Sequence, residues 1–269
     1  MNHRAPALGL AGLLLAATAP AASAADRFPT LALGVDGSIP LSFADDTYRN
    51  PAGRSDYLTS PYLKLSAFGR LMSNLNYSLY ASGGFDKYAA RPTGDSTLAS
   101  LGTGLGYRFG HFNFGGYFER NNSYDGIFGA FLYTSNDVGV YLRYNYIDAA
   151  KLWRVRPSVS ASNRFADDPS ATSYVFSFKA DIERKLHDKW WIGLTPRVRF
   201  QNFTGGENAG RQDTLGSVSG SLRYSASDQL SLSLVVGYER RVSTQSNRDF
   251  NNLGVGASVD FSHSFDVRK

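Results

Sequence analysis

The sequence predicts an all-β chain whose antiparallel strands run up and down and close into a transmembrane barrel. Three observations predict this fold: strict alternation of apolar and polar residues, alternation of short and long connections, and a composition that suits a wall between lipid and water. The chain has 16 Tyr, 18 Phe and 27 Gly, yet its mean hydropathy is −0.27. A transmembrane barrel has such a composition because only every second side chain faces lipid.

The first 24 residues have the features of a secretory signal peptide. A basic start with His3 and Arg4 precedes an apolar run over 8–17, and small residues follow at Ala22 and Ala24. The run is shorter than the roughly 20 residues that a spanning helix needs, and the small residues fit signal peptidase. We therefore expect cleavage after Ala24, with Ala25 as an alternative. Residues 25–269 then form one barrel domain.

Period-2 alternation runs through the rest of the chain and predicts its strands. Because neighbours in a strand point to opposite faces, one alternate set can be apolar while the other is polar. No helical period competes with this pattern, and no second apolar stretch of spanning length follows the signal segment. Three segments show apolar sets of the kind expected to face lipid: Leu75, Tyr77, Leu79 and Ala81; Leu230, Leu232, Leu234, Val236 and Tyr238; and Leu253, Val255, Ala257, Val259 and Phe261.

The connections fall into two alternating classes, as in outer-membrane barrels with short turns at one end and long loops at the other. We expect short turns at 72–74, 110–111, 135–137, 187–189 and 225–228. We expect long loops at 36–56, 89–95, 121–125, about 148–171, 203–213 and 243–249. These connections give about 12 strands, with 10 or 14 as alternatives. Segment 153–165 could be another strand, but one extra strand would break the alternation, so we assign it to the fourth loop.

Aromatic residues near the segment ends indicate the girdles that flank the apolar band of a transmembrane barrel. They are Tyr62, Tyr107, Phe109, Phe112, Tyr146, Trp190, Trp191, Phe200, Phe203, Tyr224 and Tyr238.

The last segment places Val259, Phe261 and Phe265 on one face and resembles the C-terminal assembly signal of bacterial outer-membrane β-barrel proteins. In those proteins the aromatic residue usually ends the chain, whereas residues 266–269 follow Phe265 here. The resemblance covers the whole mature chain and rests on pattern rather than on a motif. It implies a Gram-negative outer membrane, contact with lipid and lipopolysaccharide, and insertion by the barrel assembly machinery. The even number of strands places both termini on the periplasmic side.

Charge and cysteine content restrict the possible functions. The formal net charge of +5 becomes +4 once Arg4 is removed with the signal peptide, a small excess that gives little support to nucleic-acid binding. The chain has no cysteine, which excludes thiol catalysis and thiolate metal sites. No two histidines show metal-ligand spacing. The acidic loop residues Asp45, Asp46, Asp167 and Asp168 are expected to be solvated charges rather than a cation site.

The polar alternate set supplies the candidates for the barrel interior. We expect nine basic residues there, namely Lys64, Arg70, Arg108, Arg143, Lys179, Arg197, Arg199, Arg223 and Arg241. We expect six acidic residues beside them, namely Asp86, Glu119, Asp181, Glu183, Glu239 and Asp260. A charge on the lipid face would cost about 2–4 kcal/mol near mid-membrane, so charges gathered on one face support this orientation.

Two candidate motifs fail the context that their chemistry requires. The glycine-rich run 101–106 has no following helix, so it does not fit a nucleotide-binding loop, and we expect large side chains to fold over its glycines instead. Ser262, His263 and Ser264 suggest a lipid hydrolase, but the histidine and the serines should point to opposite faces. No third residue to orient His263 is evident.

The sequence therefore favours a channel for the passive diffusion of small solutes, with anions favoured by the basic excess. It would need no cofactor, metal or catalytic residue. The same charges could instead pair across the interior and keep a closed barrel rigid, because twelve strands lie between barrels filled by side chains and open pores. A non-conducting barrel for envelope assembly, adhesion or polysaccharide export is thus the alternative, and a lipid-modifying enzyme is a third.

Overall fold

Fourteen β-elements form one sheet in the computed structural model, which describes residues 29–45, 55–90 and 92–268. The predicted signal peptide lies outside the described residues. The elements are β1 Leu31–Ala44, β2 Asp56–Thr59, β3 Tyr62–Arg70, β4 Leu75–Tyr88, β5 Ser96–Phe109, β6 Phe112–Asp125, β7 Phe131–Tyr144, β8 Tyr146–Ile147, β9 Trp153–Ala166, β10 Ser173–His187, β11 Trp190–Phe203, β12 Gln212–Ser225, β13 Leu230–Ser243 and β14 Phe250–Arg268. Within these ranges, no helix has the length and apolarity to cross a membrane.

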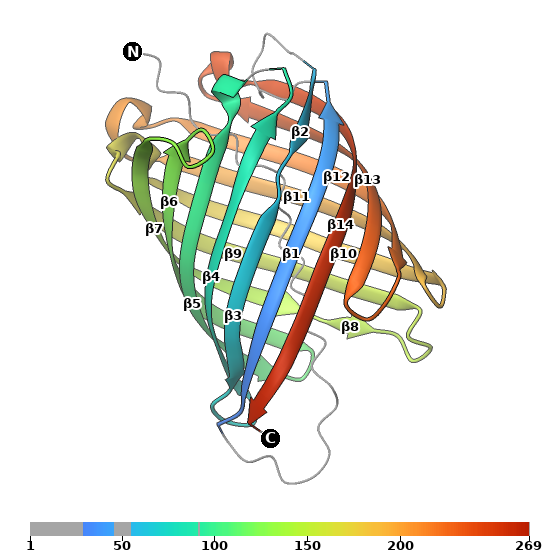
Figure 1. Cartoon of the computed structure of the whole chain (residues 1–269). Coiled ribbons are helices and arrows are strands. Elements are labelled where there is room, and N and C mark those ends of the chain that lie inside the picture. Colours follow the sequence, from blue (N-terminus) through green and yellow to red (C-terminus); the bar gives the residue numbers. More distant parts are fainter. Residues whose placement is uncertain (1–28, 46–54, 91, 269) are drawn as a thin grey trace.

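The sheet closes on itself as an antiparallel barrel (Figure 1). Neighbours in sequence pair all the way round, and the last element, β14, pairs with β1 from Ile39–Val259 at mid-strand to Ala44–Gly254 at one end. Closure satisfies every strand edge, which is a condition for a sheet to cross hydrocarbon. The fold class predicted from the sequence is thus confirmed.

The fourteen elements make twelve strands, because two elements continue their neighbours. β2 and β3 both pair with β1 and β4, so they are one strand, interrupted at Ser60 and Pro61. Proline has no backbone N–H to donate to the ladder, which explains the interruption. The two-residue β8 extends β7 along β9. Fourteen minus two gives the predicted twelve strands.

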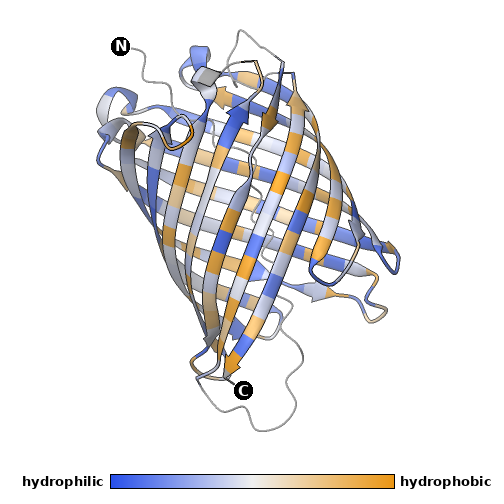
Figure 2. Cartoon of the chain, viewed as in Figure 1, coloured by the Kyte–Doolittle hydropathy of each residue, from blue (hydrophilic) through white to orange (hydrophobic). Residues whose placement is uncertain are grey.

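Apolar and polar residues alternate across the wall and give the strands a banded look in Figure 2. On β13, Leu234 and Val236 are 58% and 54% exposed, whereas Glu239 of the other set is 3% exposed. Large apolar side chains cover the exposed face all around the barrel, from Ile39 on β1 to Val255 on β14. Such a surface suits lipid rather than water.

The predicted number of twelve strands is correct, but two errors in the prediction cancel: one expected turn does not exist, and one strand was assigned to a loop. Residues 135–137 are not a turn but lie inside β7, where Ser135 and Asp137 are buried. Residues 153–165 are not a loop, because β9 pairs with both β7 and β10. The Ser-Asn-Asp sequence of 135–137 is typical of turns, but here two of its residues belong to the polar face of a strand.

Two expected loops also begin later in the sequence than predicted. β1 continues through Asp36 to Ala44, so residues 36–44 lie in a strand and not in the loop expected over 36–56. β6 includes 121–125, and its connection to β7 is 126–130. In both cases polar residues of the inner set were taken for loop residues.

Short and long connections lie at opposite ends of the barrel. We call the end with 71–74, 110–111, 188–189 and 226–229 the short-turn end, where the first and last strands also meet as Leu31 pairs with Arg268. The other, long-loop end carries four single-turn 3₁₀ segments, η1 Pro92–Gly94, η2 Pro169–Ala171, η3 Gly206–Asn208 and η4 Ser246–Arg248. The remaining connection at the short-turn end, 145–152 between β7 and β9, is longer than 126–130 at the other end. The alternation that predicted the barrel is therefore confirmed for the connections other than this one.

The predicted aromatic girdle holds for most but not all of its members. Phe109, Phe112 and Trp190 are 71%, 44% and 41% exposed, as a girdle requires. Trp191 and Phe203 are only 8% and 7% exposed, so they do not belong to it. Trp190 and Trp191 are neighbours in β11 and must point to opposite faces. The prediction for Tyr62 is also wrong, because Tyr62 lies on the same alternate set as Lys64, opposite the exposed apolar face.

Candidate functional site

The polar alternate set is the candidate functional surface. It lies opposite the exposed apolar set, and its side chains contact one another rather than lipid-facing residues. Lys64, for example, is 6% exposed and lies over the ring of Tyr80 on the next strand, 4.0 Å from the centroid. All fourteen candidate residues, and Asp86, occupy alternate positions of described strands.

Contacts that skip a strand show which face this set occupies. Tyr80 of β4 donates a hydrogen bond to Glu119 of β6 across β5, and Arg223 of β12 reaches Glu183 of β10 across β11, at 3.1 Å. Neighbouring strands lie about 4.8 Å apart, so such partners start about 10 Å apart. Side chains converge in this way on the concave side of a curved sheet and diverge on the convex side. We infer that the polar set faces the barrel interior.

Glycine makes these crossings possible. A Cβ atom built on Gly102 of β5 would lie 2.3 Å from the Tyr80 ring, so that ring passes directly over the glycine on its way to Glu119. Gly102 belongs to the run 101–106, and the expectation that a large side chain folds over it is confirmed.

Several charged residues of the polar face have polar partners within that face. Arg164 of β9 makes two hydrogen bonds to Asp137 of β7, at 2.8 and 2.7 Å. Lys179 pairs with Asp181 at 3.0 Å. Asp260 accepts hydrogen bonds from Ser38, Ser233 and Ser258.

Arginine dominates the short-turn end. Six arginines of the polar set lie within three residues of that end of their strands: Arg70, Arg108, Arg143, Arg154, Arg156 and Arg223. Of the six acidic candidates, Glu183 lies nearest to this end, and it contacts both Arg156 and Arg223. Asp266, an acidic residue of the polar set that was not among the candidates, lies two residues from the end of β14. The basic excess predicted for the interior is therefore concentrated rather than spread evenly.

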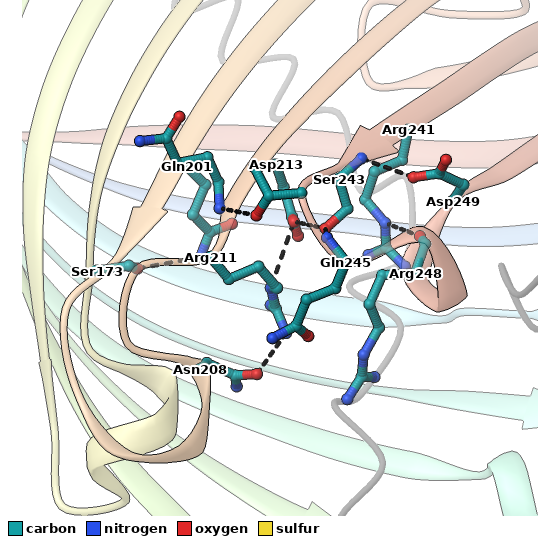
Figure 3. A network of polar contacts seen from close by, with 12 residues as sticks. Ser173, Gln201, Asn208, Arg211, Asp213, Arg241, Ser243, Gln245, Arg248 and Asp249 are labelled. Atoms are coloured by element: carbon teal, nitrogen blue, oxygen red, sulfur yellow. Dashed lines mark hydrogen bonds and ion pairs between the residues drawn. The ribbon is translucent and has the colours of Figure 1, made fainter.

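The long-loop end carries a second polar network, drawn in Figure 3. Asp213 accepts a hydrogen bond from Ser243 at 2.6 Å and pairs with Arg211 at 3.3 Å. The Arg211 guanidinium also lies 3.6 Å from the centre of the Phe203 ring. Burial lowers the pKa of Arg211, although the Asp213 carboxylate acts in the opposite direction.

The same network fixes the last loop to the wall. Ser243 donates its backbone N–H to Asp249 at 2.7 Å, and Arg241 donates to the backbone carbonyl of Arg248 at 2.7 Å. Arg241 is thus one of the predicted interior residues that helps to hold a loop.

The remaining candidates have diverse surroundings. Arg199 donates to Gln201, two residues along the same strand. Arg197 lies opposite Lys179 on β10 and within electrostatic range of Glu239. Arg143 lies 5.9 Å from the centre of the Tyr141 ring, and Arg108 is exposed.

Sequence reasoning missed several members of the polar face. Arg154, Arg156 and Arg164 lie in β9, which was assigned to a loop, although their spacing of two among Val155, Pro157 and Val159 was the signal of a strand. Trp191 was predicted for the girdle instead, and Tyr80 was placed on the polar set but not among the candidates. Their partners lie two strands away, at a distance that no local pattern reports.

The residues considered for other chemistry are held apart. Ser262 donates to Asp36 at 2.6 Å, whereas His263 contacts Gln229 at 3.0 Å, so the histidine and the serine have separate partners. Asp45 and Asp167 accept backbone N–H groups, and Asp168 caps η2. Asp46 lies outside the described residues. Over the described ranges, no three His, Cys, Asp or Glu residues are grouped so as to hold a metal ion.

Comparison with known proteins supports the fold. No protein-family model matches the chain, and no curated protein matches its sequence. Among solved structures, the chain is similar to an outer-membrane channel from Pseudomonas putida F1, with 14% identity, 87% of this chain and 97% of that chain covered, and a TM-score of 0.55.

Two porins show a weaker likeness. One is the KdgM porin in complex with disordered oligogalacturonate, with 13% identity, coverage of 85% and 99%, and a TM-score of 0.46. The other is an anion-selective porin from Comamonas acidovorans, with 9% identity, coverage of 88% and 99%, and a TM-score of 0.43. The closed twelve-stranded sheet and the likeness to the P. putida channel show that the chain has the fold of a bacterial outer-membrane β-barrel.

Proposed function

We propose that this protein is an outer-membrane channel through which small anionic solutes diffuse. The observation that carries the proposal is the concentration of six arginines of the polar set at the short-turn end, where they outnumber the acidic residues Glu183 and Asp266. Rings of Arg and Lys favour anions, because the field in a narrow aqueous passage acts on the ion at close range. The P. putida protein with the same fold is described as a channel.

The proposal gives the barrel an orientation and a setting. In outer-membrane barrels the short turns face the periplasm and the long loops face outward, so both ends of this barrel chain would be periplasmic. The exposed apolar band would contact lipid and, at the long-loop end, lipopolysaccharide. The barrel assembly machinery would insert the chain after signal cleavage. The fourteen candidate residues would line the solute pathway.

A planar-bilayer recording tests the channel directly. With a KCl gradient across the membrane, we expect steady conductance and a reversal potential that indicates anion preference. The double substitution Arg197→Glu with Arg199→Glu should shift the preference towards cations, because it changes the formal charge of the polar face by −4. Unchanged selectivity would show that these residues do not line the pathway.

A matched control carries the same charge change on the other face. Arg184 and Arg240 occupy the exposed alternate set, so Arg184→Glu with Arg240→Glu should leave selectivity unchanged. A folded barrel without conductance would instead favour the non-conducting alternative, in which pairs such as Arg164–Asp137 fill the interior.

A further inference from the structure

Five side chains from four neighbouring strands meet at the short-turn end of the polar face. Arg154 and Arg156 begin β9, Glu183 ends β10, Trp191 begins β11 and Arg223 ends β12. The register places Glu183 beside Arg154, and Trp191 beside Arg223. We call these five residues the arginine cluster.

The cluster assembles over a glycine. Glu183 is paired with Gly193 of β11. Arg223 crosses β11 and reaches the glutamate from the far side. A larger residue here would face Ser221, whose Oγ lies 2.5 Å from the Cβ position of Gly193.

One carboxylate serves the arginines of the cluster. Arg156 donates to Oε2 of Glu183 at 2.9 Å, and Arg223 lies 3.1 Å from Oε1. Both oxygens of Glu183 are thereby engaged. Arg154 lies over the Trp191 ring, 4.3 Å from its centroid, and within electrostatic range of both other arginines. Three positive charges against one negative charge leave a net charge of +2.

The cluster also has unmet hydrogen-bond donors. In the described part of the chain, six buried side-chain polar atoms lack a hydrogen-bond partner, and three of them are the Nε atoms of Arg154, Arg156 and Arg223. A buried donor without a partner is costly, and guanidinium groups bind carboxylate and phosphate oxygens in a fork geometry. The arginine cluster therefore combines a net positive charge with three hydrogen-bond donors that have no partner.

We propose that Arg154, Arg156 and Arg223 form a binding site for a small oxyanion that carries two negative charges, a dicarboxylate or a phosphate. Such an ion would neutralise the net charge of +2 and offer several acceptor oxygens to the guanidinium groups. Glu183 holds two of the arginines in place and, by its own charge, keeps the affinity low enough for release, as conduction requires. The role of this site in transport rests on the proposed function. The binding of an oxyanion to the site can nevertheless be measured without any measurement of conductance.

Isothermal titration of the mature protein in detergent tests the site. The probes are succinate for the dicarboxylate and inorganic phosphate for the phosphate, each titrated at low chloride. We expect one or both to bind, and Arg154→Gln, Arg156→Gln and Arg223→Gln each to weaken binding about tenfold, the usual loss for one charge-assisted hydrogen bond. Glu183→Gln should tighten binding, because it removes the competing negative charge.

Arg184→Gln is the matched control, since Arg184 lies next to Glu183 but belongs to the exposed face. It should leave the affinity unchanged. The heat-dependent shift in electrophoretic mobility reports whether each variant is a folded barrel. Where an arginine-to-glutamine variant does not fold, Arg154→Lys keeps the charge but loses the fork and should bind more weakly than the parent.

The outcomes separate the site from the channel. Binding of succinate, of phosphate or of both supports the site and identifies the source of the oxyanion. The site is overturned if neither probe binds, or if Arg154→Gln and Arg184→Gln bind with equal affinity. A barrel that binds the probe but does not conduct would overturn the proposed function and leave the site standing.

Discussion

Single residues decide how the polar face is organised, and Gly102 shows this most clearly. The Tyr80 ring occupies the space that a side chain at position 102 would need, and its hydroxyl donates to Glu119 on the far side. The sequence indicated that large residues would fold over this glycine run. It could not indicate which residue, because Tyr80 and Gly102 become neighbours only through the pairing of β4 with β5.

Gly102→Ala should destabilise the barrel. The new methyl group must displace the Tyr80 ring and so weaken its hydrogen bond to Glu119, at a cost of about 1–3 kcal/mol, as in overpacked interiors. Denaturant titration of the folded barrel in lipid vesicles measures the loss. Gly237→Ala is the control, since the nearest atom to its Cβ position is Ser219 Cβ at 3.4 Å, an ordinary contact. Equal losses in the two variants would contradict the account of Gly102.

At the scale of elements, β9 is the most informative strand. Its alternation, with Arg154, Arg156 and Arg164 on one face, is as regular as that of other strands. It was assigned to the fourth loop because, with a turn expected at 135–137, one extra strand would break the alternation of short and long connections. The same strand carries two of the three arginines of the proposed oxyanion site, so this error hid the site as well.

Val159→Arg tests whether β9 lies in the membrane. Val159 pairs with Phe178 and Leu142, which are 41% and 42% exposed on the outer face. An arginine there should cost about 2–4 kcal/mol of unfolding free energy in vesicles.

Ser160→Arg is the matched control for this test, since Ser160 lies at the next position and so on the opposite face. A lipid-facing strand predicts a much larger loss for Val159→Arg than for Ser160→Arg. A loop outside the membrane would tolerate both substitutions alike, and that result would contradict the strand.

At the scale of the whole molecule, closure between the first and last strands is the defining event. β1 and β14 are more than 200 residues apart in sequence, as in the pair Ile39–Val259, yet they pair along their length. An open sheet would leave both strands with an unpaired edge, which hydrocarbon does not tolerate. Closure also gives the sheet a concave side, on which side chains can meet across a strand.

A disulfide across the seam tests closure. The chain has no cysteine, so Ile39→Cys with Val259→Cys introduces a single possible pair. Directly opposed residues in antiparallel strands have Cα atoms about 4.5–5.5 Å apart, within the range that a disulfide spans. Oxidation should therefore cross-link the variant, and electrophoresis with and without reductant detects the link.

Ile39→Cys with Val255→Cys is the control, because Val255 pairs with Phe43, four residues along β1. It should not cross-link within one chain. Equal cross-linking in both variants, or in neither, would contradict the register of the seam.

The sequence by itself determined the fold class, the two kinds of connection and the division of its strands into an apolar and a polar set, because alternation is a local property of an extended chain. It also predicted twelve strands, but only because two errors cancelled. The tertiary structure decided which strands those were, placing β9 in the wall and removing the turn at 135–137. It also decided which polar residues meet, such as Arg223 with Glu183 across β11. Such contacts depend on barrel closure, strand register and sheet curvature. These properties relate residues on different strands, so the sequence of a single strand does not reveal them.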